Sequence, residues 1–116
     1  MTDTITIQRL LASTTIGVPD EEREDPQDVE ISLEMTPPEP LRFLDDDISK
    51  TIDYYAVSRR VLEIAATGER KLIETLADDV AEAVLDEFHI AKVIVEVRKF
   101  ILSDTEYVAV RIEREG

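Results

Sequence analysis

The side chains of this 116-residue chain that could do chemistry are carboxylates, amines, guanidinium groups and phenols. The sequence contains no cysteine, which excludes disulfides, thiolate nucleophiles and cysteine-bound metals. Its single histidine, His89, cannot build a multi-histidine zinc site and is expected to be structural or exposed. Gly-rich phosphate loops and nucleophile elbows are also absent. We therefore expect proton transfer and hydrogen bonding, with no metal and no cofactor.

Four side chains have types suited to this chemistry, but their positions alone favour ordinary structural roles. Glu74 lies near the start of a predicted helix, where a carboxylate can accept hydrogen bonds yet usually faces solvent. Lys99 ends a predicted strand next to Arg98, and strand-end cations are usually exposed. Tyr54 carries a phenol that can donate a proton, although a lone tyrosine is more often a core aromatic. Glu22 lies in a charged loop and would by itself be a solvated acid.

The first half of the chain predicts an antiparallel pair of strands. Residues 4–16 alternate and are β-branched, with a slip near Arg9 that indicates a bulge. Residues 18–26 are rich in charges and proline and predict a turn, and residues 29–35 alternate again. Three prolines and an acidic triplet make residues 36–50 a connection that is long enough for a functional loop.

The second half predicts two helices followed by two strands. Asp53 is placed to cap a helix that runs to about Thr67, in which we expect Tyr55, and not Tyr54, to belong to the core. Residues 73–86 place apolar side chains on one helix face and acids on the other. Alternation at 93–97 and 107–112 predicts the last two strands.

The element order β-β-α-α-β-β predicts an α+β fold, in which two helices cover one face of an antiparallel sheet. The chain length fits a single domain over residues 1–116. Exposed strand edges promote association, so the sheet could continue into neighbouring copies, unless the edges are covered or twisted.

The charge and hydropathy of the chain exclude several classes of partner. Thirteen basic and 27 acidic residues give a net charge of -14, which repels nucleic acid and anionic lipid. The first residues lack the basic and apolar pattern of a secretory signal, and no apolar run approaches the roughly 20 residues that a membrane span needs. We expect a cytoplasmic protein that binds neither nucleic acid nor membrane.

Four blocks of the sequence together resemble the dihydroneopterin aldolase family. The segment 17–27, GVPDEEREDPQ, has the family pattern of a glycine, an acidic loop, Glu-Arg and a Gln that opens the next strand. It is followed in order by TIDY at 51–54, LIETLA at 72–77 and VEVRK at 95–99. The resemblance extends from Ile5 to Arg114 and implies the tunnelling fold. In that fold four subunits close a sixteen-stranded barrel, two such rings commonly stack, and pterins bind between adjacent subunits, so a homotetramer or homo-octamer is implied.

The resemblance also implies roles for single residues. Lys99 matches the lysine used for proton transfer and substrate orientation, and Glu22 the loop acid that meets the hydroxylated side chain of the substrate. Tyr54 matches a tyrosine that the neighbouring subunit contributes to return a proton. The substrate-binding residues implied are Glu74, as the pterin anchor, with Ile73 in the same block, and Thr51 and Ile52, which pass the ring in the adjacent subunit.

The implied reaction is retro-aldol cleavage of dihydroneopterin to hydroxymethyl-dihydropterin and glycolaldehyde, a step of folate synthesis. One departure leaves an alternative open: the segment after Lys99, FILSDTEY at 100–107, is shorter than the typical aldolase loop and lacks its proline and glycine. Its length resembles the dihydroneopterin triphosphate epimerase branch. The acidic chain offers no evident triphosphate cradle, which favours the aldolase. A noncatalytic ring that binds a pterin is the third alternative.

Overall fold

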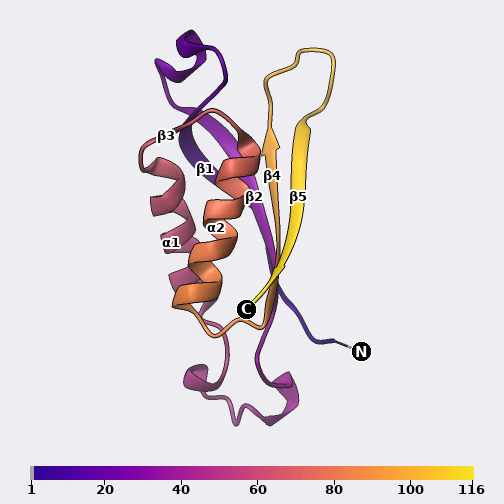
Figure 1. Cartoon of the computed structure of the whole chain (residues 1–116). Coiled ribbons are helices and arrows are strands. Elements are labelled where there is room, and N and C mark those ends of the chain that lie inside the picture. The colour runs from indigo at the N-terminus through magenta and orange to yellow at the C-terminus, as the bar shows by residue number, and fades with distance from the viewer. Residues whose placement is uncertain (1) are drawn as a thin grey trace.

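The computed structural model describes residues 2–116 and contains the predicted strands and helices in the predicted order; Met1, the first residue of the predicted domain, lies outside the described residues. The two helices cover one face of a curved sheet (Figure 1). The elements are β1 (Ile5–Ile16), β2 (Gln27–Thr36), α1 (Tyr54–Ala66), β3 (Glu69–Arg70), α2 (Ile73–Glu87), β4 (Lys92–Lys99) and β5 (Val108–Glu115).

The sheet has five strands in the order β3-β1-β2-β4-β5, one more than the sequence predicted. The four long strands pair with one another in antiparallel orientation, as expected. The additional strand, β3, pairs in parallel with the end of β1 over Thr15 and Ile16. Because β3 consists of two polar residues, it has no alternating pattern, and its pairing depends on how the chain between the helices is placed.

The predicted bulge in β1 is confirmed. The pairing of β1 with β2 shifts register between Ile7 and Leu10, and Arg9 has a φ of +56°. The Arg9 backbone N–H leaves the strand ladder and donates to the Ser32 hydroxyl at 2.9 Å. This displaced bond satisfies the extra residue of the bulge and bends the strand.

The core lies between the sheet and the two helices. Alternate residues of β2 and β4 point toward the helices and are fully buried, and the apolar stripes of α1 and α2 pack against them. Burial of each large aliphatic side chain contributes about 1.5 to 3 kcal/mol, so this layer is the main source of stability. The fully buried residues of β2 and β4 are Val29, Ile31, Leu33, Met35, Val93, Val95 and Val97.

Helix α1 begins where the sequence predicted, but the expected burial of Tyr55 was wrong. The Asp53 carboxylate accepts the Ala56 backbone N–H at 3.1 Å and caps the helix. Tyr55 is 67% exposed because it precedes the buried Val57 by two positions, which places it on the opposite side of the helix. Tyr54 is also exposed, at 63%.

The strand register and the helix directions create two distinct ends of the molecule, whose longest dimension is 51 Å. We call the end with residues 17–26, 69–74 and 99–108 the Lys99 end, and the end with residues 37–54 and 88–92 the Tyr54 end (Figure 1). At one end Lys99 pairs with Val29, and at the other Lys92 pairs with Thr36. Over residues 2–116, each helix is too short or too polar to cross a bilayer.

Candidate active site

The turn after β1 holds Glu22 against a glycine. Gly17 has a φ of +151°, which strongly favours glycine. A Cβ atom at Gly17 would lie 2.4 Å from Cδ and 2.6 Å from Oε1 of Glu22, well inside contact distance. The short 3-10 turn Asp20–Arg23 carries Glu22 back over this glycine. Because Gly17 has no side chain, the Glu22 side chain can occupy the space beside it.

Gly17→Ala should lower the free energy of unfolding by about 1 to 3 kcal/mol, because it adds backbone strain and displaces Glu22. Gly68→Ala is the matched control: Gly68 also has a positive φ, +71°, but its added Cβ would meet nothing within 4 Å. Urea unfolding of the two variants compares the effects. Equal losses would show that the contact between Gly17 and Glu22 contributes nothing.

Arg23 holds the turn in place. Its guanidinium donates to the carbonyl oxygens of Gly17 at 2.6 Å and Val18 at 3.0 Å. It also forms ion pairs with Asp20 at 2.6 Å and with Glu69 of β3 at 3.2 Å. These bonds tie the turn to the segment that leads into α2. Sequence reasoning assigned Arg23 no role, although the Glu-Arg pair in the family pattern pointed to it.

Lys99 and Glu22 form a close, mostly buried ion pair. Lys99 Nζ lies 2.6 Å from Glu22 Oε2, and the two side chains are only 13% and 16% exposed. The hydrogen bond from Lys99 lowers the pKa of Glu22 below its usual value, with a further contribution from Gln27 and against the effect of burial. A lowered pKa in the folded state means that this interaction stabilises the fold above the unfolded-state pKa of Glu22. The stabilisation is lost as the pH falls through the folded-state value.

The structure separates Lys99 from its neighbour Arg98. Arg98 lies on the sheet face away from the helices, where it pairs with Glu96 at 2.7 Å and stacks over the Tyr107 ring at 4.3 Å. Lys99 follows the buried Val97 by two residues, so strand alternation turns it to the other face. Of the two cations, Lys99 is therefore the one beside Glu22.

Glu74 lies at the same end, on the first turn of α2. It is exposed, and within residues 2–116 its carboxylate makes no hydrogen bond or ion pair. Leu72 precedes the helix without a side-chain cap, which leaves backbone N–H groups open at this helix end. Ile73 is only 8% exposed, and its side chain belongs to the core.

The Tyr54 end of the molecule holds the other three predicted site residues, Tyr54, Thr51 and Ile52. Helix α1 rises about 1.5 Å per residue, so its 13 residues separate Tyr54 from β3 by roughly 18 to 20 Å. Ile52 is 2% exposed and has its side chain in the core. Thr51 has a buried hydroxyl that finds no hydrogen-bond partner among residues 2–116. One chain therefore does not bring these three residues to Glu22 and Lys99.

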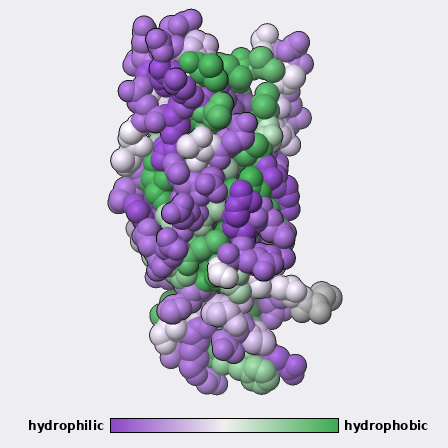
Figure 2. All heavy atoms as spheres, viewed as in Figure 1, coloured by the Kyte–Doolittle hydropathy of each residue, from purple (hydrophilic) through white to green (hydrophobic). Residues whose placement is uncertain are grey.

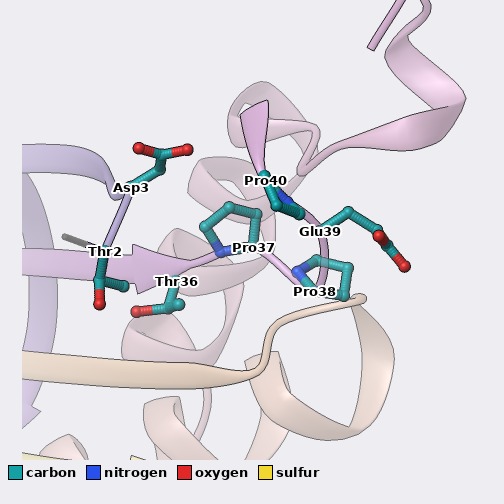
Figure 3. A pocket seen from close by; sticks show the side chains of 7 residues that line it. All are labelled: Thr2, Asp3, Thr36, Pro37, Pro38, Glu39 and Pro40. Atoms are coloured by element: carbon teal, nitrogen blue, oxygen red, sulfur yellow. The ribbon is translucent and has the colours of Figure 1, made fainter. Parts of the chain in front are cut away.

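The hollows at the Tyr54 end include two that border the proline-containing segment. The first is framed by Pro37, Pro38 and Pro40 and by Asp3 near the N-terminus (Figure 3). The second, of about 440 Å³, is lined in part by Phe43, Thr51 and His89. Neither includes a residue of the Lys99 end. The predicted site residues thus form two separate groups within one chain.

The acidic side chains do not gather into a metal site. Over the described range 2–116, no three His, Asp or Glu side chains are arranged to hold an ion. The groups at the Lys99 end that can act on a ligand are the Glu22 and Lys99 pair and the open Glu74 carboxylate. They suit hydrogen bonding to a polar molecule and proton transfer.

Comparison with known protein families identifies the chain. The family model for dihydroneopterin aldolase, FolB, matches residues 5–113, which is nearly the whole sequence. The chain belongs to the dihydroneopterin aldolase family. This match includes all four sequence blocks and each of the residues to which the resemblance gave a role.

Individual members of the dihydroneopterin aldolase family are similar to this chain in both sequence and structure. The dihydroneopterin aldolase of Streptomyces coelicolor is 32% identical over 101 residues, covering 84% of this chain and 82% of its own. A Vibrio cholerae crystal structure assigned as dihydroneopterin aldolase (FolB) has a TM-score of 0.93 and 32% identity, and covers 100% and 99% of the two chains. Escherichia coli dihydroneopterin aldolase in complex with neopterin has a TM-score of 0.90 and 29% identity, and covers 97% and 98%. The predicted tunnelling fold is confirmed for the subunit.

Proposed function

We propose that this family member cleaves dihydroneopterin to hydroxymethyl-dihydropterin and glycolaldehyde, and is thus a carbon–carbon lyase of folate biosynthesis. The observation that carries the proposal is the ion pair of Lys99 and Glu22, 2.6 Å apart, at the same end of the subunit as the open Glu74 carboxylate. Neopterin bound to the Escherichia coli relative supports a pterin ligand.

Glu74 is proposed to anchor the pterin. Its carboxylate can accept two parallel hydrogen bonds, from the amino group and from a ring N–H of the substrate, and charge strengthens both bonds. The Ile73 backbone lies beside it at the open end of α2. The absence of a competing partner for Glu74 within residues 2–116 leaves these acceptor sites available.

Glu74→Ala should weaken neopterin binding about tenfold to a hundredfold, because a charge-assisted pair of hydrogen bonds is lost. Glu82→Ala is the control, since Glu82 is an exposed acid on the same helix. Titration calorimetry with neopterin measures both variants. An unchanged dissociation constant for Glu74→Ala would remove this residue from the pocket.

The other groups are proposed to act on the hydroxylated side chain of the substrate. Glu22 and Lys99 orient this side chain, and the pair takes up the single proton that its hydroxyl group loses as the carbon–carbon bond breaks. The bond electrons pass to the ring imine, glycolaldehyde leaves, and an enol intermediate remains. A proton from Tyr54 converts this enol to hydroxymethyl-dihydropterin. Because the ring accepts the electrons, Lys99 forms no Schiff base.

Assembly of several copies is proposed to bring Tyr54 to Lys99. Within the described chain, the outer edge of β5 and most of the outer edge of β1 pair with no strand. A homotetramer or homo-octamer that joins such edges would leave no open edge. In that ring a neighbouring copy supplies Tyr54, with Thr51 and Ile52 passing the pterin ring.

Exposed apolar side chains at both ends support this junction. Figure 2 shows apolar atoms within the mostly hydrophilic surface at the Lys99 end. There Phe100, Ile101 and Leu102 are 48 to 50% exposed. At the Tyr54 end Phe43 and Ile48 are 69% and 61% exposed. Exposed apolar patches of this kind are typical of surfaces that meet another protein.

Epimerisation of the substrate side chain is a second candidate activity, favoured by the loop after Lys99. This loop lacks proline and glycine, and its ends are joined by an edge-to-face contact between Phe100 and Tyr107 with ring centroids 6.3 Å apart. Epimerisation uses the same cleaved intermediate and differs only in recapture of the two-carbon fragment. A loop that delays the release of this fragment would favour it.

One experiment separates these activities. Purified protein is incubated with dihydroneopterin and, separately, with its triphosphate, and the products are resolved by chromatography. Release of glycolaldehyde with hydroxymethyl-dihydropterin is the expected result and supports the aldolase. Formation of a monapterin isomer without cleavage would support the epimerase. Binding of neopterin with neither product would overturn both activities and leave a noncatalytic pterin-binding ring.

A further inference from the structure

Gln27 joins the end of β1 to the carboxylate of Glu22. It is the first residue of β2, and its side-chain amide nitrogen makes two hydrogen bonds. This nitrogen donates to the Ile16 carbonyl oxygen at 2.9 Å and to Glu22 Oε2 at 2.8 Å. An amide nitrogen has two N–H groups, so both are occupied. The bond to Ile16 fixes the direction in which the second N–H points.

The same carboxylate oxygen of Glu22 accepts hydrogen bonds from both Gln27 and Lys99. Lys99 Nζ lies 2.6 Å from Glu22 Oε2, and Gln27 Nε2 lies 2.8 Å from it. The two donors come from neighbouring strands, because Lys99 of β4 pairs with Val29, two residues after Gln27 in β2. Gly17 closes the other side of the Glu22 side chain. The carboxylate is thus held in one orientation by two strands and a glycine.

We propose that Gln27 is a positioning residue of the reaction, whose amide holds the Glu22 carboxylate in the orientation that meets Lys99. This inference rests on the proposed function. Gln27 is uncharged at every pH, so it donates to Glu22 without competing with Lys99 for the proton. Since an N–H donor favours the ionised carboxylate, Gln27 also keeps Glu22 charged to lower pH.

The charged groups around Glu22 do not replace this contribution. Lys99 faces the carboxylate from β4, and Arg23 acts on it from the same turn. The Arg23 guanidinium is already bonded to two carbonyl oxygens, to Asp20 and to Glu69 of β3. Without Gln27, Lys99 would be the one donor bonded to the carboxylate within residues 2–116, and the Glu22 side chain could rotate about that bond.

The test replaces Gln27 by methionine, which keeps the length of the side chain and removes both N–H donors. The control is Gln8→Met, because Gln8 is exposed in β1. For each protein, kcat/KM for dihydroneopterin is measured across the acid range. The Glu22 carboxyl is followed by NMR in protein with carbon-13-labelled glutamate, and its resonance is identified by its absence in Glu22→Gln.

For Gln27→Met we expect kcat/KM near neutral pH to fall about tenfold to a hundredfold, since a hydrogen bond to a charged group is lost. The acid limb of the rate profile and the NMR midpoint of Glu22 should both move to higher pH. Neopterin binding through Glu74 should be nearly unchanged. Gln8→Met should match the wild-type protein in all three measurements.

Two outcomes overturn the inference and differ from failure of the proposed function. A Gln27→Met variant with an unchanged acid limb and an unchanged midpoint would show that Gln27 does not position Glu22. If the variant loses thermal stability but keeps the acid limb of the rate profile and the NMR midpoint of Glu22, Gln27 is a purely structural residue. By contrast, a wild-type protein that converts neither dihydroneopterin nor its triphosphate overturns the proposed function and, with it, any role of Gln27 in turnover.

Discussion

Lys99→Ala is expected to lower kcat for dihydroneopterin by about a hundredfold to ten-thousandfold, the usual range for loss of a proton-transfer group. The affinity for neopterin should fall far less, because Glu74 holds the pterin ring in the proposed site. Steady-state kinetics and calorimetry measure the two effects separately. Equal losses of turnover and binding would instead assign Lys99 a purely positioning role.

The control for this variant is Lys92→Ala. Lys92 lies at the other end of β4, and within residues 2–116 its ammonium group makes only a long contact to Glu113, at 3.9 Å, so its removal should leave turnover unchanged. Loss of Lys99 also leaves the mostly buried Glu22 carboxylate without its ion-pair partner. The double variant Lys99→Ala with Glu22→Gln removes this unpaired charge. If the double variant regains stability but not turnover, the lost rate belongs to the chemistry.

Mixed oligomers of Tyr54→Phe and Lys99→Ala chains should recover activity that neither variant has alone. Tyr54 and Lys99 lie at opposite ends of one chain, so the proposed site takes one residue from each of two copies. Random mixing in equal amounts should then restore about a quarter of the sites, because each site needs both intact residues. The chains are unfolded together, refolded and assayed with dihydroneopterin.

The alternative arrangement gives the opposite result. If one chain supplied both residues, every site in the mixture would carry one defect, and activity would stay at the level of the single variants. Chains that are refolded separately and then combined provide the control for exchange between rings. Recovery only after joint refolding would locate the site between copies.

The sequence predicted the elements well because each has a local cause. Period-two alternation in β2 and β4 and the helical stripe of α2 reflect burial on one face, and Asp53 caps its own helix through a bond three residues away. The bulge at Arg9 was visible as a break in alternation. Tyr55 and β3 were missed because helix rotation and a two-residue pairing leave no clear pattern in the sequence.

Some residues of the site could likewise be predicted from the sequence, and others could not. Residue types, spacing and family resemblance were sufficient to nominate Glu22, Tyr54, Glu74 and Lys99, since a motif preserves order along the chain. They could not choose between Lys99 and Arg98 on physical grounds, and they gave no role to Arg23 or Gln27. Those assignments needed the strand register that faces Lys99 toward Glu22 and the positive φ at Gly17.

The sequence by itself determined the α+β class, the two strand pairs, the Asp53 helix cap and the absence of thiol chemistry, because these depend on composition and on neighbours within a few residues. Only the tertiary structure decided which side chains meet. It placed Lys99 2.6 Å from Glu22, although the two residues are 77 positions apart in the sequence, and it put Tyr54 at the opposite end of the subunit. Such contacts depend on strand register and helix direction, which are set by packing of the whole core.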